Sequence, residues 1–105
     1  MKMVIAIFRP ERLTSVRDGL EALGLRSMTI SEVRGRGSQD GVSREYRGQQ
    51  VVVDYLPRVK LELVVDAGPI DDAIEVIRRE AATGSTGDGR IFVVPIEQSL
   101  NISAS

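Results

Sequence analysis

The alternating run at residues 59–65 is the feature that most constrains the fold of this chain. Its odd-numbered positions are all apolar, and Lys60 and Glu62 stand between them. A period of two residues is typical of a β-strand that buries one face and exposes the other. Other elements must therefore cover the apolar face, and a chain of 105 residues allows one domain with a modest core.

Five further segments complete the predicted fold. Apolar residues recur at helical spacing in two of them, and the other three are short apolar or β-branched runs. In chain order we predict a strand at 2–8, a helix at 13–23, strands at 28–34 and 59–65, a helix at 70–81 and a strand at 90–95. This βαββαβ order is that of the ferredoxin-like α+β fold, with a four-stranded antiparallel sheet and two helices on one face. The prediction is a single domain over residues 1–105.

A glycine-rich loop joins the second predicted helix to the last strand. Residues 83–90 run Thr-Gly-Ser-Thr-Gly-Asp-Gly-Arg. Glycine lets backbone N–H groups turn toward one point, and Arg90 adds a fixed positive charge, so the loop suits a phosphate or another anion. It is not a Walker A loop, because Gly-Lys-Ser/Thr is missing and a strand follows. An ordinary helix-to-strand turn explains the same residues.

The connection between the two central strands is far longer than a hairpin needs. It covers residues 35–58, and connections of this length in compact domains are uncommon and often functional. The segment contains tyrosines, valines and Leu56, with glycines at 35, 37, 41 and 48, so its composition differs from that of a disordered linker. We interpret it as an extended arm that orders against a ligand or partner. A β-hairpin extension is the alternative.

Missing residue types exclude several activities. The chain has no cysteine and no histidine, which removes disulfides, thiol nucleophiles, the usual metal ligand and the commonest general base. The acids Asp71, Asp72 and Glu75 suit the first turns of a helix. Glu62 faces away from the apolar positions, where it would meet either a ligand or water. We predict no catalytic residue and no enzyme activity.

Charge and hydropathy limit the cellular location and the kinds of partner that we expect. The net charge is −1, and the strands lack base-stacking aromatics apart from Phe8 and Phe92, so no nucleic-acid partner is expected. The apolar run at residues 4–8 is too short for a signal peptide or a membrane span. We expect a cytoplasmic protein that does not insert into membranes.

Taken together, four stretches resemble the PII family of nitrogen-regulatory signalling proteins, over residue 1 to about residue 96. They are MTISEVRG at 28–35, EYRG at 45–48, VDYLPRVKLE at 53–62 and, at 83–93, TG followed by GDGRIFV. The resemblance implies a homotrimer with nucleotide sites in clefts between subunits. It makes residues 36–58 the T-loop, which inserts into a partner such as a membrane transporter or metabolic enzyme. Residues 83–90 become the phosphate-holding B-loop, and residues 97–105 a divergent tail.

The resemblance also implies which residues form the sites. Those that bind nucleotide would be Ile7, Thr29, Gly35, Gly37, Ser38, Glu62, Val64, Gly87, Asp88, Gly89 and Arg90. Those that bind the effector would be Gln39, Gly41 and Arg58, and Gln39 would also ligate magnesium if Mg-ATP binds. Arg58 and Arg90 replace lysines of the family and keep their charge.

Several positions depart from the family pattern. Typical members have arginines where this chain has Ser38, Asn101 and Ser103, and losing these contacts should weaken ATP more than ADP or AMP. Asp40 replaces a frequent lysine beside the effector site. Positions modified by uridylylation or phosphorylation in some relatives carry the residues Gln49 and Val51, so neither modification is expected there.

These departures favour one of two ligand hypotheses. In the favoured one, the protein binds ADP or AMP together with a small anion such as bicarbonate, like PII-like relatives associated with carboxysomes and inorganic-carbon uptake. In the alternative, it is a conventional sensor of ATP, ADP and 2-oxoglutarate. A slow nucleotide hydrolase that uses a magnesium ion on Gln39 is the third reading.

Overall fold

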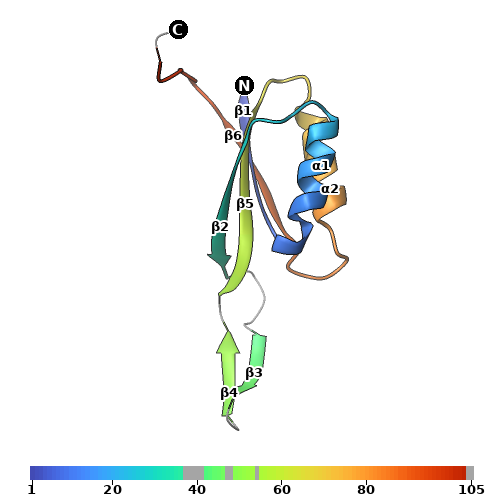
Figure 1. The fold of residues 1–105 in the computed structure, drawn as a ribbon, viewed down its shortest axis with the longest axis vertical. Helices are drawn as coiled ribbons and strands as arrows, with labels where there is room; N and C mark the ends of the chain where they lie inside the picture. The colour runs from blue at the N-terminus through green and yellow to red at the C-terminus, as the bar shows by residue number, and fades with distance from the viewer. Residues whose placement is uncertain (37–41, 47–48, 54, 104–105) are drawn as a thin grey trace.

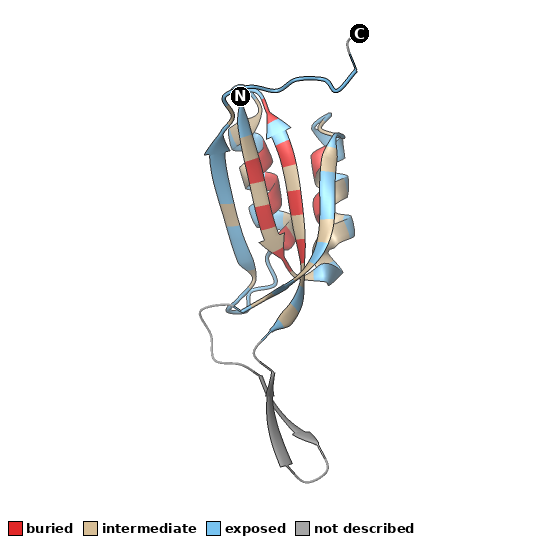
Figure 2. Cartoon of the chain, turned by 90° about the vertical axis from the view of Figure 1, so that its left-hand side faces the viewer, coloured by how far each residue is buried: buried red, intermediate tan, exposed pale blue. Residues whose placement is uncertain are grey.

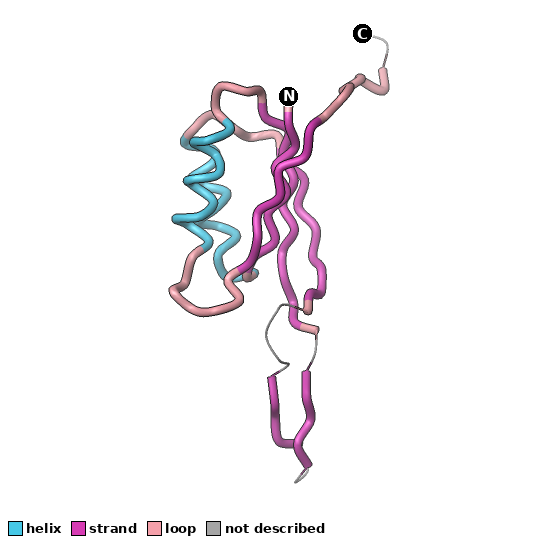
Figure 3. The backbone as a smooth tube through the Cα atoms, turned by 180° about the vertical axis from the view of Figure 1, so that it is seen from behind, coloured by secondary structure: helices cyan, strands magenta, loops and turns pink. Residues whose placement is uncertain are grey.

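The computed structural model describes residues 1–36, 42–46, 49–53 and 55–103. Four antiparallel strands form the main sheet in the order β2-β5-β1-β6, and both helices lie on one side of it (Figures 1 and 3). The elements of this body are β1 (Lys2–Phe8), a 3-10 turn η1 (Pro10–Arg12), α1 (Leu13–Ala22), β2 (Met28–Gly35), β5 (Leu56–Val65), α2 (Ile70–Ala81) and β6 (Gly89–Pro95). The predicted ferredoxin-like α+β fold is confirmed.

The core lies between the helices and the sheet. Buried and half-buried residues alternate along β1 and β5, as the period of two residues requires (Figure 2). The largest fully buried side chains come from both layers: Phe8 and Leu61 from the strands, and Leu20 and Ile77 from the helices. Each such side chain contributes roughly 2 kcal/mol by leaving water, so this one cluster accounts for much of the favourable free energy of folding.

The fourth predicted element, the central strand, begins earlier than its alternation indicates. The sequence predicts a start at residue 59, whereas β5 begins at Leu56 and includes Pro57. Proline has no N–H and is usually excluded from the middle of a sheet. Here the last β1 pair is Phe8 with Val59, so residues 56–58 pair only with β2, and the missing donor costs little.

Within the arm, two short strands pair with each other. They are β3 (Val42–Tyr46) and β4 (Gln49–Val53), which form a separate antiparallel sheet in which Val42 is opposite Val53 (Figure 1). The hairpin that we weighed as the alternative is thus present within the arm, and ordering of the arm against a ligand or partner stays a prediction. The β-branched run at residues 51–53 is the local reason for a strand there.

The sheet has a second face that neither helix covers. Along β1, β5 and β6 it carries apolar side chains such as Ile5 and Ile7, which are half-buried. Val64 and Phe92 on the same face are 47% and 45% exposed. We call this surface the outer face, and it carries part of the set that the resemblance assigns to the nucleotide site, namely Ile7, Thr29, Glu62, Val64 and Arg90.

Candidate functional site

Strand register brings the predicted adenine-pocket residues onto the outer face. Thr29 of β2 is directly opposite Glu62 of β5, and Ile7 of β1 is directly opposite Arg90 of β6. Side chains that are opposite each other in antiparallel strands stand on the same side, about 5 Å apart. Ile7 is also opposite Lys60, two residues from Glu62, so the two pairs occupy neighbouring rows.

Other predicted residues extend the same surface in both directions along the strands. Val64 follows Glu62 by two residues, near the end of β5 away from the arm. Arg58 and Gly35 lie near the strand ends next to the arm. The Arg58 Nη1 donates a hydrogen bond to the Pro57 carbonyl oxygen at 2.8 Å, so one N–H of its guanidinium is engaged locally. The remaining predicted residues, Gly37, Ser38, Gln39 and Gly41, lie outside the described residues, as does Asp40.

Arg90 is an exposed cation at the edge of the outer face. Its guanidinium carbon lies 6.0 Å from the centre of the Phe92 ring, a weak cation–π contact that holds the side chain along β6. In the part of the chain that the structure describes, Arg90 forms no ion pair. Its N–H groups can therefore bind an incoming anion.

The glycine-rich loop needs its glycines for backbone geometry. Gly84, Gly87 and Gly89 have φ angles of 84°, 83° and 135°, which other residues rarely adopt. A Cβ on Gly89 would lie 1.9 Å from the carbonyl oxygen of Ile7, because β6 begins against the end of β1 here. The loop therefore reaches the sheet at one fixed place, next to Arg90.

The carboxylate of Asp88 closes this loop on itself. One oxygen, Oδ2, accepts hydrogen bonds from the backbone N–H groups of Thr83 and Gly84 at 2.8 and 3.2 Å. The other, Oδ1, accepts from the Thr83 hydroxyl and from Arg9 Nε, the latter at 3.2 Å. Two N–H groups of the loop thus converge on the loop's own carboxylate, and the predicted phosphate cradle stays a prediction.

These contacts favour the ionised form of Asp88. The Thr83 hydroxyl has the largest effect, followed by the Thr83 N–H, and Arg9 and the Gly84 N–H add to them. Together they lower the pKa of Asp88 to about 2, against an opposing effect of desolvation that is larger than the effect of Arg9 alone. The group is therefore an anion throughout the neutral range, next to a loop predicted to hold phosphates.

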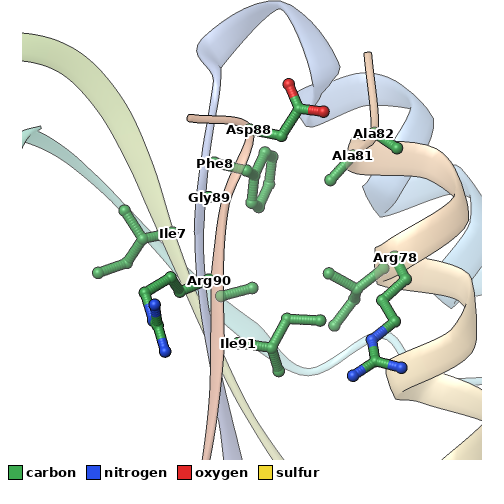
Figure 4. Close-up of a pocket in the computed structure, with 11 residues that line it drawn as sticks. Ile7, Phe8, Arg78, Ala81, Ala82, Asp88, Gly89, Arg90 and Ile91 are labelled. Atoms are coloured by element: carbon green, nitrogen blue, oxygen red, sulfur yellow. The ribbon is translucent and has the colours of Figure 1, made fainter. Parts of the chain in front are cut away.

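A cavity of about 380 Å³ lies on the opposite side of β6, against α2. Figure 4 shows Phe8, Ile91 and Ala81 directed into it, whereas the side chains of Ile7 and Arg90 point away toward the outer face. The predicted residues Thr29, Glu62 and Val64 do not line this cavity. Four other predicted residues, Ile7, Asp88, Gly89 and Arg90, do line it, so the cavity and the outer face meet along the start of β6.

Arg9 contacts the predicted loop but was assigned to no site, and Thr83 was predicted only as the first residue of that loop. From the sequence, Arg9 is only the residue that follows the first predicted strand, which ends at residue 8. The available signal is positional: the end of β1 meets the start of β6, where Phe8 is opposite Gly89, so a basic residue after β1 falls beside Asp88. That register does not follow from the sequence alone.

The described part of the chain contains neither a cluster of metal-ligating side chains nor a membrane-spanning helix. No group of three or more carboxylates there is arranged to hold a metal ion. Neither helix is long and apolar enough to cross a membrane.

Known proteins are similar to this chain over nearly its whole length. The family model described as Nitrogen regulatory protein P-II matches residues 1–105. Nitrogen regulatory protein P-II 2 of Methanothermobacter thermautotrophicus is 44% identical over 102 residues, which cover 97% of this chain and 89% of the relative. The P-II proteins of Rhodospirillum rubrum and Haemophilus influenzae are 44% and 46% identical, each over 97% of this chain and 91% of the relative.

Proposed function

Because the chain belongs to the family of nitrogen regulatory P-II proteins, we propose that it binds an adenine nucleotide and a small anion as a homotrimer. In this proposal the arm then transmits the bound state to a transporter or metabolic enzyme. The observation that carries the proposal is the position of Arg90, an exposed cation between the glycine-rich loop and the outer face.

The outer face suits an adenine ring, and the loop suits its phosphates. Ile7 and Val64 offer apolar contact, and the carboxylate of Glu62 is an acceptor for an exocyclic amino group. Arg90 offers a charge-assisted hydrogen bond to phosphate, beside the backbone of Gly87. The nucleotide would thus lie with its base on the outer face and its phosphates at the loop, shared with a neighbouring subunit.

The small number of positive charges at the loop favours nucleotides with short phosphate chains. Arg9 is already paired with Asp88, which leaves Arg90 as the free cation of the described loop. Asn101 and Ser103 are uncharged where the family places arginines. Since each phosphate added to the chain needs more charge compensation, we expect ADP or AMP to bind more tightly than ATP.

Two anions are candidates for the effector. Bicarbonate is favoured by the altered charges, since Arg58 remains and Asp40 adds a negative charge that a dianion would meet unfavourably. The alternative is 2-oxoglutarate with ATP or ADP, and the relatives named nitrogen regulatory proteins favour it. The effector residues Gln39 and Gly41 lie outside the described residues, so the choice depends on measurement.

Calorimetry with ATP, ADP and AMP, each alone and with bicarbonate or 2-oxoglutarate, separates the two hypotheses. Enhancement of ADP or AMP binding by bicarbonate is expected. Tight, Mg-ATP-dependent binding of 2-oxoglutarate would contradict the bicarbonate hypothesis and support the conventional sensor. Phosphate release followed over hours, with Gln39→Ala as the control, tests the slow hydrolase. A rate of many turnovers per minute that disappears in the variant would show an enzyme.

A matched pair of variants locates the nucleotide. Arg90→Ala should weaken ADP binding by about 10–100-fold, because it removes a charged contact to phosphate. Arg90 also lines the cavity from β6, whereas Arg78→Ala removes an exposed arginine from its α2 side and should leave the affinity unchanged. Both are measured by calorimetry at the same salt concentration. The reverse result would place the ligand against α2.

A further inference from the structure

We propose that Arg9 is a positioning residue for nucleotide binding, which orders the loop at residues 83–89 and neutralises Asp88 beside the phosphates. The inference rests on the proposed function, because it assumes that phosphates bind at this loop. It adds a residue that lies outside the predicted site and that acts through other side chains.

Arg9 holds the loop from outside at two points. It follows the end of β1, far from the loop in sequence. Its Nε lies 3.2 Å from Oδ1 of Asp88, and its Nη2 donates a hydrogen bond to the carbonyl oxygen of Thr86 at 3.0 Å. The Arg9 and Asp88 side chains are only 23% and 25% exposed, so solvent screens their contact less than it screens a pair on the open surface.

Asp88 connects Arg9 to the start of the loop. Its carboxylate accepts hydrogen bonds from the N–H groups of Thr83 and Gly84, while Arg9 contacts the middle of the loop at Thr86. The loop is thus tied at its start, middle and end before any ligand arrives. A loop ordered in advance loses less conformational entropy on binding, which raises affinity without a new contact to the ligand.

Charge gives Arg9 a second effect. Asp88 is ionised and belongs to the loop that would hold phosphates, so alone it would repel them. The guanidinium of Arg9 compensates that charge at 3.2 Å. Without Arg9, repulsion would grow with the number of phosphates and would shrink as salt is added. A residue with a purely structural role would produce neither dependence.

The test compares nucleotide affinities of four variants with the wild type by calorimetry. Arg9→Ala should weaken ADP about tenfold, with a larger loss for ATP, a smaller loss for AMP, and less difference among the three at high salt. Arg9→Lys keeps the charge but not the two-point fork, so it should restore the wild-type ratio of ATP to AMP affinity at a lower overall affinity. In the double variant R9A/D88N the uncompensated carboxylate is gone, so the loss of affinity should no longer grow from AMP to ADP to ATP.

Arg12→Ala is the matched control. Arg12 lies in the turn after Arg9 and donates a hydrogen bond from Nε to the Glu80 carbonyl oxygen at 2.7 Å, but it contacts α2 and not the loop. Its removal should lower thermal stability while leaving all three affinities unchanged. If R12A reproduced the charge-dependent loss of R9A, the effect would be a general one and the inference would be wrong.

Amide hydrogen exchange without nucleotide separates this inference from the proposed function. Exchange at Thr83 and Gly84 should be several-fold faster in R9A and D88N than in the wild type and R12A. If the wild type bound no adenine nucleotide, the proposed function would fail, whatever the exchange rates. If the wild type bound nucleotide and both R9A and R9K matched it in affinity and exchange, the role of Arg9 would be overturned.

Discussion

At the scale of single residues, Gly89 has the least freedom to change. Its φ of 135° is strained for any residue with a side chain, and an added Cβ would meet backbone atoms that cannot rotate away. Gly24 provides the comparison, because its φ is 84° and nothing lies within 4 Å of an added Cβ. A substitution at Gly24 would therefore show the cost of backbone strain alone, whereas one at Gly89 would add steric collision.

We therefore expect Gly89→Ala to cost about 4 kcal/mol or more of unfolding free energy, and Gly24→Ala only about 1–2 kcal/mol. Urea unfolding followed by circular dichroism gives both values. Equal losses in the two variants would mean that β6 can move away from Ile7 and that the close approach is not essential.

Asp88 gives stability a specific dependence on pH. Its folded-state pKa is about 2, below the value of about 3.9 in an unfolded chain, so the folded state binds its proton less readily. The stabilisation from the ionised group is therefore fully present above about pH 4 and is lost as the pH falls toward 2. Thr83 is the main cause of the shift.

The difference in unfolding free energy between wild type and Asp88→Asn should accordingly be constant from pH 8 to about pH 5 and should shrink between about pH 4 and pH 2. In Thr83→Ala the loss should be smaller and should be complete at a higher pH, because the hydroxyl that lowers the folded-state pKa most is gone. Denaturant titrations at each pH test both statements. A difference that stayed the same at pH 2 and pH 7 would contradict the assigned contacts.

At the scale of elements, the contact between α1 and α2 depends on Gly19. An added Cβ there would lie 2.6 Å from Cγ1 of Val76, which belongs to a stiff β-branched side chain. Glycine in the middle of a helix is costly by itself, so its presence reflects the close approach of the helices. The sequence alone shows only a residue that weakens α1.

Gly19→Ala should therefore destabilise the protein by about 1–2 kcal/mol, although alanine is the better helix former by about 1 kcal/mol. Val76→Ala makes room for the added methyl group. The double variant should thus lose less than the sum of the two single losses, by about 1 kcal/mol, in thermal or urea unfolding. Strictly additive losses would show that the two residues do not share this space.

Elements were predictable from the sequence where one local pattern decided them. The alternation around Leu61 and the helical spacing around Ile77 gave the body of the fold, including the face on which Glu62 stands. The boundaries of β5 and the β3–β4 hairpin depended on which neighbours each segment pairs with. Contacts such as Arg9 with Asp88 join positions 79 residues apart, and no local pattern contains them.

At the scale of the whole molecule, the outer face connects assembly with ligand binding. Val64 and Phe92 are nearly half exposed on a surface that the helices leave uncovered. Contiguous apolar surface of this kind marks sites of association. In the proposed homotrimer, a neighbouring subunit's outer face would complete the nucleotide site.

Sedimentation velocity should show the wild type at three times the chain mass of 11.5 kDa. Val64→Glu should shift the protein toward monomer, because it places a charge in an apolar contact. Leu23→Glu is the control, since Leu23 is 40% exposed but lies at the end of α1, away from the outer face. Dissociation of the Leu23 variant and not the Val64 variant would assign the interface to the helices.

The strand order also sets when this chain can fold during synthesis. Both neighbours of β1, β5 and β6, come from the second half of the sequence, and β2 pairs only with β5. A nascent chain that has emerged from the ribosome as far as residue 55 thus carries two strands of the main sheet with no partner for either. Translation must deliver the central strand before the sheet can start, and β6 before the loop can close on Asp88.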